Sequence, residues 1–310
     1  MYIRLDFIKC ALMIDLSGVF PPLPTAFDKD ENLRPDKIRF NIERLSRYEL
    51  SGFLLLGSNG ELSMLNHKER IETLHVGREA IEPGKLMLAG TGCESTQETV
   101  VLTREAAKAG ADAALVLNPF YYKEQMTHNA LVMHFFTVAE AATIPVVIYN
   151  MPSNTGIDMS AETILAISKH PNIIGLKDSG GNLVKMGQII GQAKEGFQVL
   201  AGSAGFLLPA LAIGAVGGVL ALANIAPSPC IGILKAFALG RMDEARAIQL
   251  KLIPLNAAVT RQWGVAALKD AMQHCGLYGG PVRKPLLPIT ADLREKVLDL
   301  MKENQICSND

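Results

Sequence analysis

The sequence has few cysteines and histidines, and none of them are spaced like ligands of a metal ion. The 310 residues hold five cysteines without a CxxC pair and six histidines without an HxxxH pattern. Scattered cysteines in odd number are typical of a reducing compartment and argue against a disulfide scaffold or a zinc site. We therefore expect free thiols, no metal ion and a cytoplasmic protein.

The chain also lacks an excess of charge of either sign. It has 30 basic and 31 acidic side chains and no block of basic residues. This balance argues against nucleic acid or an anionic membrane as a partner. Hydrophobic residues make up 49% and charged residues only 20%, which is typical of a sheet covered on both faces and compatible with a buried subunit interface.

One stretch, residues 197–234, has no charged side chain and is long enough to cross a bilayer. Glycines and prolines divide it into short pieces, so we interpret it as a strand–helix–strand–helix passage buried in a soluble core. The first 18 residues mix basic and acidic side chains, which argues against a secretory signal or a transit peptide.

Short apolar runs alternate along the chain with amphipathic stretches. The apolar runs cover residues 18–27, 52–61, 85–92, 113–119, 145–152, 172–181, 197–205 and 216–224. The amphipathic stretches between them are Pro35–Tyr48, His67–Ile81, Thr96–Ala109, Thr127–Ala142, Ala161–His170, Leu183–Ala193 and Phe206–Ile213. Eight strands that alternate with helices predict an α/β fold, a (β/α)₈ TIM barrel. A doubly wound open sheet is the alternative, which the absence of a GxGxxG turn disfavours.

After Asn224 the pattern becomes helical to the end of the chain. It predicts helices over Met242–Leu255, Gly264–Cys275 and Ala291–Glu303. We therefore divide the chain into an N-terminal extension (1–16), a barrel (17–240) and C-terminal helices packed on the barrel (241–310).

Polar residues follow several of the predicted strands. Since reactive groups of such barrels lie at the carboxyl ends of strands, these side chains should face one cavity. They are Ser58, Asn59, Gly60 and Glu61 after the second strand, Tyr121 and Tyr122 after the fourth, Tyr149 in the fifth, Lys177 in the sixth, and Gly202 and Ser203 after the seventh.

Lys177 ends an apolar run in "NIIGLKDSGGN". Desolvation favours the uncharged form of a lysine side chain, and such an amine forms Schiff bases with carbonyl substrates. The alternative is a lysine that reaches from the end of a strand into solvent, while Asp178 and the glycines form a turn.

Two further features favour the chemical interpretation. Tyr149 follows "PVVI" near the rim, where a phenol can carry protons during formation and collapse of a carbinolamine. A Gly-Ser-Asn-Gly turn contains Ser58 and offers backbone N–H groups that suit a carboxylate. The alternatives are a core tyrosine and an ordinary strand–helix turn in which Asn66 caps the next helix.

The segments "GSNGE", "YNMPSNTG" and "GLKDSGGN" resemble the motifs of the pyruvate-dependent class I aldolase superfamily of dihydrodipicolinate synthase and N-acetylneuraminate lyase. They occur in the expected order and spacing, and the resemblance covers about residues 18–287. Within the superfamily the chain is most similar to the 4-hydroxy-2-oxoglutarate aldolase branch, through "AGTGCESTQETV", "FQVLAGSAGFL" and "YGGPVRKPL".

The resemblance implies a Schiff-base carbon–carbon lyase that acts on a small 2-oxo acid, without a cofactor. Lys177 would form the imine, Tyr149 would carry protons, and Ser58 and Tyr121 would complete a hydroxyl relay. It also implies a homotetramer, cytosolic or mitochondrial, with Tyr121 or Tyr122 close to a neighbouring subunit. We expect contacts to substrate from Asn59, Gly60, Ser179, Gly202, Ser203 and Asn154.

One position departs from the dihydrodipicolinate synthase pattern. Those enzymes usually have an arginine two residues after the proline of the YNxP motif, where it binds the carboxylate of aspartate semialdehyde. Asn154 stands at that position and cannot make a bidentate charge-assisted bond. We therefore expect cleavage of 4-hydroxy-2-oxoglutarate to pyruvate and glyoxylate. A 2-keto-3-deoxy sugar-acid aldolase, a dihydrodipicolinate synthase-like enzyme and a silent oxo-acid-binding homologue remain alternatives.

Overall fold

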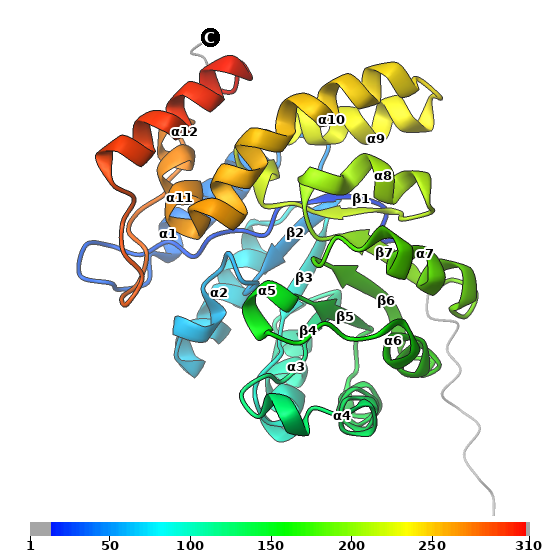
Figure 1. The fold of residues 1–310 in the computed structure, drawn as a ribbon. Helices are drawn as coiled ribbons and strands as arrows, with labels where there is room; N and C mark the ends of the chain where they lie inside the picture. Colours follow the sequence, from blue (N-terminus) through cyan, green and yellow to red (C-terminus); the bar gives the residue numbers. More distant parts are fainter. Residues whose placement is uncertain (1–13, 308–310) are drawn as a thin grey trace, which may run out of the picture.

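Eight parallel strands form the centre of the protein, and helices surround them (Figure 1). The computed structural model describes residues 14–307, so most of the expected N-terminal extension lies outside the described residues. Neighbouring strands pair in the order β1-β8-β7-β6-β5-β4-β3-β2. The barrel closes between β1 and β2, where the N–H groups of Ser51 and Leu54 donate to the carbonyls of Val19 (3.1 Å) and Pro21 (3.0 Å). The predicted TIM barrel is confirmed.

Each predicted apolar run contains one strand. The strands are Gly18–Phe20 (β1), Gly52–Leu55 (β2), Leu86–Gly90 (β3), Ala113–Leu117 (β4), Val146–Asn150 (β5), Ile173–Asp178 (β6), Gln198–Ala201 (β7) and Gly217–Val219 (β8). The predicted runs are longer than the strands because they include the loops at the carboxyl ends, and these loops carry the polar residues of interest.

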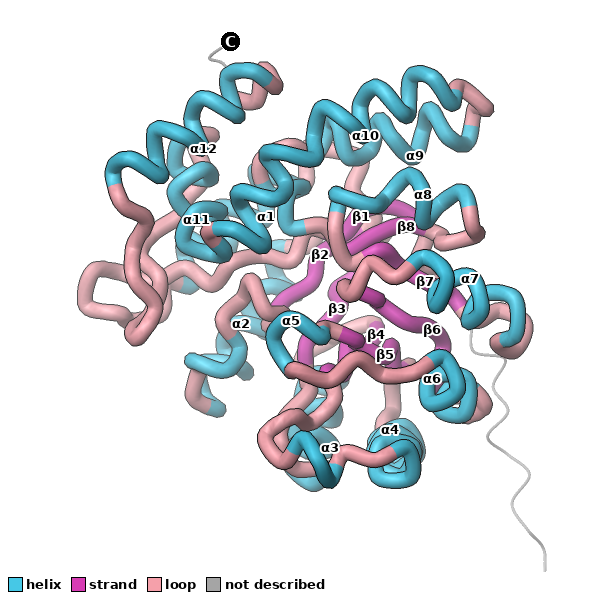
Figure 2. The backbone as a smooth tube through the Cα atoms, in the orientation of Figure 1, coloured by secondary structure: helices cyan, strands magenta, loops and turns pink. Residues whose placement is uncertain are grey.

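The helices lie outside the strands (Figure 2). They are Pro35–Leu45 (α1), His67–Ala80 (α2), Thr96–Lys108 (α3), His128–Ala141 (α4), Pro152–Thr155 (α5), Ala161–Ser168 (α6), Leu183–Gln192 (α7), Leu207–Ala212 (α8), Pro227–Ala238 (α9), Met242–Ala257 (α10), Gly264–His274 (α11) and Ala291–Glu303 (α12). Polar caps explain several starts: Asn66 and Glu69 form a capping box at α2, and Ser95 caps α3.

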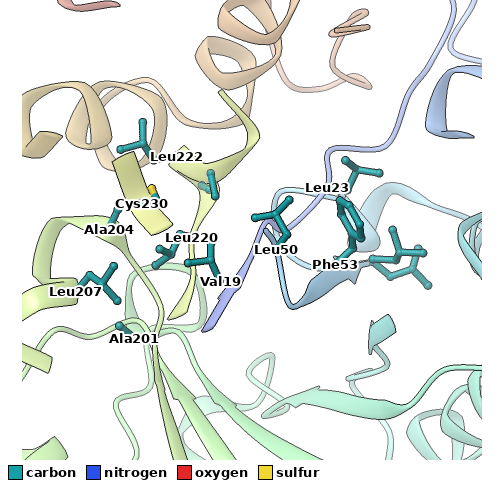
Figure 3. Packing of buried hydrophobic residues seen from close by; sticks show 14 of the residues in the cluster. Val19, Leu23, Leu50, Phe53, Ala201, Ala204, Leu207, Leu220, Leu222 and Cys230 are labelled. Atoms are coloured by element: carbon teal, nitrogen blue, oxygen red, sulfur yellow. The ribbon is translucent and has the colours of Figure 1, made fainter. Parts of the chain in front are cut away.

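Two hydrophobic clusters fill the molecule, one inside the barrel and one between the strands and the helices. The inner cluster consists of Leu16, Phe20, Leu54, Leu88, Ala113, Leu115, Val147, Tyr149, Leu200 and Val219. Figure 3 shows part of the outer cluster, in which Val19 and Leu220 lie near Cys230 of α9. Because apolar side chains fill the interior, reactive groups can meet solvent only at the ends of the barrel.

The C-terminal helices contact the mouth of the barrel. In α10, Gln249 donates to the carbonyl of Ala204 (2.7 Å) and accepts from the N–H of Leu208 (2.9 Å). Asn256, also in α10, donates to the hydroxyl of Ser203 (3.0 Å). The helix α10 therefore supports the loop that follows β7, and α12 packs against α11 and α10 (Figure 1).

The expectation of free thiols is wrong at two positions. Cys275, just after α11, forms a disulfide with Cys307, and their Cα atoms are 5.0 Å apart. The pair was hidden from sequence spacing because its members are 32 positions apart in the sequence, with α12 between them. Cys93 and Cys230 are free, and Cys10 lies outside the described residues. The cysteine pattern therefore gives no argument for a reducing compartment.

The uncharged stretch 197–234 folds as a series of short elements. It contains β7, α8, β8 and the first part of α9, in the strand–helix–strand–helix order expected. Within residues 14–307, no helix is both long enough and apolar enough to cross a bilayer.

Candidate active site

The carboxyl ends of β5 and β6 bring Tyr149 and Lys177 together. The two residues are partners in the register of this parallel pair. Both are almost fully buried, with 3% of Tyr149 and 4% of Lys177 exposed. The Nζ atom of Lys177 lies 3.9 Å from the centroid of the Tyr149 ring. An amine and a phenol therefore share one buried environment at the mouth of the barrel.

Ser58 reaches the same place from the loop after β2. Its Oγ lies 3.1 Å from the hydroxyl oxygen of Tyr149, and either atom can donate the hydrogen bond. Two hydroxyls within hydrogen-bond distance can pass a proton between them, and the buried amine lies beside one of them. Lys177, Tyr149 and Ser58, which are far apart in the sequence, thus form one constellation.

The remainder of the loop after β2 is tightly folded. The hydroxyl of Thr25 donates to the carbonyl of Gly60 (2.6 Å), and both residues are buried. A Cβ on Gly60 would lie only 3.1 Å from the backbone nitrogen of Leu56, so a side chain there would crowd the backbone of the loop. Asn59 is half-buried beside Ser58. The loop therefore holds Ser58 and Asn59 at the mouth with little freedom.

The loops after β6 and β7 bring Ser179 and Gly202 into contact. The N–H of Gly202 donates to the carbonyl of Asp178 (2.7 Å), and a Cβ on Gly202 would lie 2.0 Å from Oγ of Ser179. The hydroxyl of Ser179 is buried and has no hydrogen-bond partner among residues 14–307. A buried hydroxyl without a partner is available to a ligand, and the substrate contact of Ser179 stays a prediction.

Ser203 and Asn154 are two further residues predicted to contact the substrate. Ser203 caps a short 3₁₀ helix by accepting from the N–H of Gly205 (3.2 Å), and it also accepts from Asn256. Its hydroxyl is therefore already engaged within the chain. Asn154 is exposed in α5.

Tyr121 lies apart from the constellation within this chain. It is 74% exposed, and its ring meets that of Tyr122 edge to face with centroids 5.1 Å apart. Its backbone N–H donates to the carboxylate of Glu94 (2.9 Å). In the described part of the chain, the hydroxyl of Tyr121 makes no hydrogen bond to Ser58 or Tyr149. Its place in a relay remains a prediction.

A polar cluster that the sequence did not suggest lies on the outer side of β5 and β6. The carboxylate of Asp178 is fully buried and accepts from the side chain of Asn150 (2.9 Å), its register partner. It also accepts from the N–H groups of Gly180 (2.8 Å) and Gly181 (3.2 Å). Lys185 of α7 lies 3.1 Å from the same carboxylate. Because neighbouring residues of a strand face opposite sides, this cluster lies behind Tyr149 and Lys177.

The cluster extends to the segment after α5. Lys185 also pairs with Asp158, and Asn150 donates to Asp158 (2.8 Å). The side-chain oxygen of Asn150 accepts from the N–H of Met159 (3.1 Å). Lys185 therefore neutralises two carboxylates, and the contacts fix the ends of β5 and β6 against α7.

Comparison with known proteins agrees with this geometry. The sequence matches the dihydrodipicolinate synthetase family over residues 15–304. The chain belongs to this family. It is 35% identical over 285 residues to a 4-hydroxy-tetrahydrodipicolinate synthase of Methanothrix thermoacetophila, covering 92% of this chain and 95% of the relative. It is 36% identical over 273 residues to a probable mitochondrial 4-hydroxy-2-oxoglutarate aldolase of Emericella nidulans, covering 86% and 88%.

Solved structures of the family share the fold. Dihydrodipicolinate synthase DapA-2 from Bacillus anthracis superposes with a TM-score of 0.90 at 28% identity, covering 94% of this chain and 99% of that one. YagE from Escherichia coli, solved in complex with pyruvate, gives a TM-score of 0.89 at 28% identity, covering 95% and 100%. The expected superfamily is therefore correct, and its members with known names include both a synthase and an aldolase.

Lys185→Met should lower the free energy of unfolding by roughly 3 kcal/mol, because it leaves the buried carboxylate of Asp178 without its cation. Urea unfolding measures this loss. The double variant Lys185→Met/Asp178→Asn serves as the control and should recover much of it, since no uncompensated charge remains at Asp178. A loss below about 1 kcal/mol in the single variant, as for an exposed pair, would contradict this account.

Proposed function

We propose that this protein is a Schiff-base aldolase that cleaves 4-hydroxy-2-oxoglutarate to pyruvate and glyoxylate. The main support is the buried amine of Lys177 beside the hydrogen-bonded hydroxyls of Tyr149 and Ser58. An amine held away from water is a competent nucleophile toward a ketone, and the hydroxyls supply the proton transfers that imine formation needs. A protein that only bound oxo acids would have no use for this combination.

In the first half of the proposed reaction, Nζ of Lys177 adds to the C2 ketone of the substrate. The resulting carbinolamine loses water with a proton supplied through Tyr149, and a protonated imine forms. Ser58, Asn59 and neighbouring backbone N–H groups hold the C1 carboxylate. The imine is itself the electron sink, so the reaction as proposed requires no further cofactor.

In the second half, the C4 hydroxyl loses its proton and the C3–C4 bond breaks. Glyoxylate leaves, and the electron pair of the broken bond moves into the imine to give the enamine of pyruvate. Protonation at C3 restores the imine, and water releases pyruvate and the free amine. Tyr149, within hydrogen-bond distance of Ser58, relays these protons in our proposal.

The choice of substrate depends on Asn154. Its neutral amide replaces the arginine that usually binds aspartate semialdehyde in dihydrodipicolinate synthases, and an amide cannot supply a charge-assisted pair. The relative from Emericella nidulans named as a probable 4-hydroxy-2-oxoglutarate aldolase supports the same choice. Several relatives of similar identity are named as synthases, so the substrate must be decided by assay.

Lys123 is our candidate for binding the second carboxylate of the substrate. A Cβ built on Gly156 would lie 2.7 Å from Nζ of Lys123, so the ammonium rests against the end of α5, two residues from Asn154. It therefore offers a positive charge from the loop after β4 near the position where the arginine is missing.

We extend the proposal to a homotetramer. Tyr121 and Tyr122 are 74% and 66% exposed, although both are aromatic and lie close to the mouth of the barrel. Large exposed aromatic side chains are enriched at protein interfaces, which suits a contact with a neighbouring subunit.

Pyruvate release from 4-hydroxy-2-oxoglutarate, coupled to lactate dehydrogenase, should exceed release from 2-keto-3-deoxygluconate. It should also exceed consumption of pyruvate in the presence of aspartate semialdehyde, since Asn154 offers that substrate no cation. Release from the sugar acid alone would support the aldolase chemistry and show that the proposed substrate is wrong. A dominant reaction with aspartate semialdehyde would overturn the role given to Asn154.

Tyr149→Phe should lower kcat for this cleavage by about 10²–10⁴, the loss typical of a missing acid–base group. Ser58→Ala is the matched variant, because it removes the other hydroxyl of the pair, and it should lower kcat less than the loss of Tyr149. Coupled turnover measures both. A kcat near that of the wild type in Tyr149→Phe would assign the proton transfers to another group.

Lys123→Ala should raise KM for 4-hydroxy-2-oxoglutarate by about tenfold, since one charge-assisted contact contributes roughly 1.5 kcal/mol. Reductive trapping of pyruvate, which lacks the second carboxylate, should be unchanged. Steady-state kinetics measure the change in KM, and trapping with borohydride measures the reaction with pyruvate. Equal losses with both ligands would show that Lys123 supports the fold of the site and does not select the substrate.

A further inference from the structure

A buried ion pair joins the loop that carries Ser58 to the C-terminal helices. Glu61 ends this loop, and its Oε1 lies 2.5 Å from Nζ of Lys269 in α11. Each of the two side chains is only 1% exposed. The other carboxylate oxygen of Glu61 accepts from the backbone N–H of Arg283 (2.9 Å). The proposed reaction uses neither of these two charges.

Lys269 is held by three groups. Besides Glu61, its ammonium donates to the carbonyl of Pro281 (2.7 Å) and lies 4.6 Å from the centroid of the Phe27 ring. Burial lowers the pKa of Lys269, and the carboxylate of Glu61 opposes that shift. The ammonium is thus enclosed by a carboxylate, a carbonyl and an aromatic face.

A second ion pair holds Arg283, the residue whose backbone N–H donates to Glu61. The guanidinium of Arg283 forms a two-bonded pair with Glu69, at 2.7 and 2.8 Å, and donates to the carbonyl of Met64 (3.0 Å). Glu69 also completes the capping box of α2. Its pairing with Arg283 holds the pKa of Glu69 below its usual range. Arg283 therefore contacts the chain before and after the short 3₁₀ turn Leu62–Met64 that follows the loop.

The backbone of the loop requires such support. Leu56 and Glu61, on either side of the Gly-Ser-Asn-Gly turn, both have left-handed backbone conformations, with φ of 57° and 52°. Residues with a Cβ rarely adopt this conformation and keep it only where their surroundings fix it. The ion pair with Lys269 is attached to one of these two residues.

We propose that Glu61 and Lys269 are positioning residues, whose ion pair fixes the loop 57–61 so that the Ser58 hydroxyl stays at the Tyr149 hydroxyl. A role in stability alone explains the pair less well. Burying two charges costs solvation that their attraction only partly repays, and apolar replacements of such pairs are often neutral or stabilising. The catalytic consequence rests on the proposed aldolase function, whereas the effect on the loop does not.

The test separates stability from positioning with the double variant Glu61→Gln/Lys269→Met. It removes both charges, keeps similar side-chain volumes and leaves an acceptor for the N–H of Arg283. The control is Val297→Ala, which loosens the packing of the fully buried Val297 of α12 near α11 without touching the ion pair. Three quantities are measured: the midpoint of urea unfolding, kcat for 4-hydroxy-2-oxoglutarate, and hydrogen exchange of the amides in residues 56–64.

The double variant should unfold near the wild-type midpoint, yet its kcat should fall by about 10- to 100-fold, because a small displacement of a reacting group has that effect. Exchange of the loop amides should rise by about tenfold as the loop opens locally. Val297→Ala should lower the unfolding midpoint while leaving kcat and loop exchange close to wild type. Should the double variant not fold, Glu61→Gln alone is judged by kcat and by loop exchange, and its unfolding midpoint should fall because the buried ammonium of Lys269 loses its carboxylate.

Two results would overturn the inference. One is a double variant whose kcat stays within about twofold of wild type, the scatter expected for independent sites. The other is unchanged exchange in the loop. If the wild-type protein itself forms no pyruvate, the proposed function fails, and loop exchange still decides whether the ion pair holds the loop.

Discussion

The parallel pairing of β5 with β6 is the constraint on which the site depends. Its register places Tyr149 opposite Lys177 on the inner side and Asn150 opposite Asp178 on the outer side. A shift of β6 by one residue against β5 would turn Lys177 out of the barrel and bring the carboxylate of Asp178 in, opposite Tyr149. The hydrogen bond from Asn150 to Asp178 lies one residue beyond Tyr149 and Lys177 and opposes such a shift.

The two sides of these strands differ in their electrostatic environment. On the outer side, Lys185 and backbone N–H groups satisfy the carboxylate of Asp178, so that charge is neutralised away from the amine of Lys177. On the inner side, Lys177 lies against the ring of Tyr149, whose hydroxyl is within hydrogen-bond distance of Ser58. The loop with Ser58 completes this inner side. Lys269 of α11 contacts the same loop through its ion pair with Glu61.

The sequence was informative wherever the relevant contact is local or follows from the barrel geometry. The strands, the helix start at Asn66, and the gathering of Ser58, Tyr149 and Lys177 at one mouth followed from periodicity, capping and the strand-end rule. Relationships between distant side chains did not follow. The pairs Glu61–Lys269 and Cys275–Cys307 depend on how the C-terminal helices fold back, which no local pattern encodes.

Formation of an imine on Lys177 is the central claim, and reductive trapping tests it most directly. The protein is incubated with pyruvate and borohydride, digested with trypsin, and the modified peptide is located by mass spectrometry. The account predicts one adduct, on Lys177, within a peptide spanning residues 170–185 because trypsin no longer cleaves at the modified lysine. No adduct, or an adduct confined to another lysine such as Lys185 or Lys269, would contradict it.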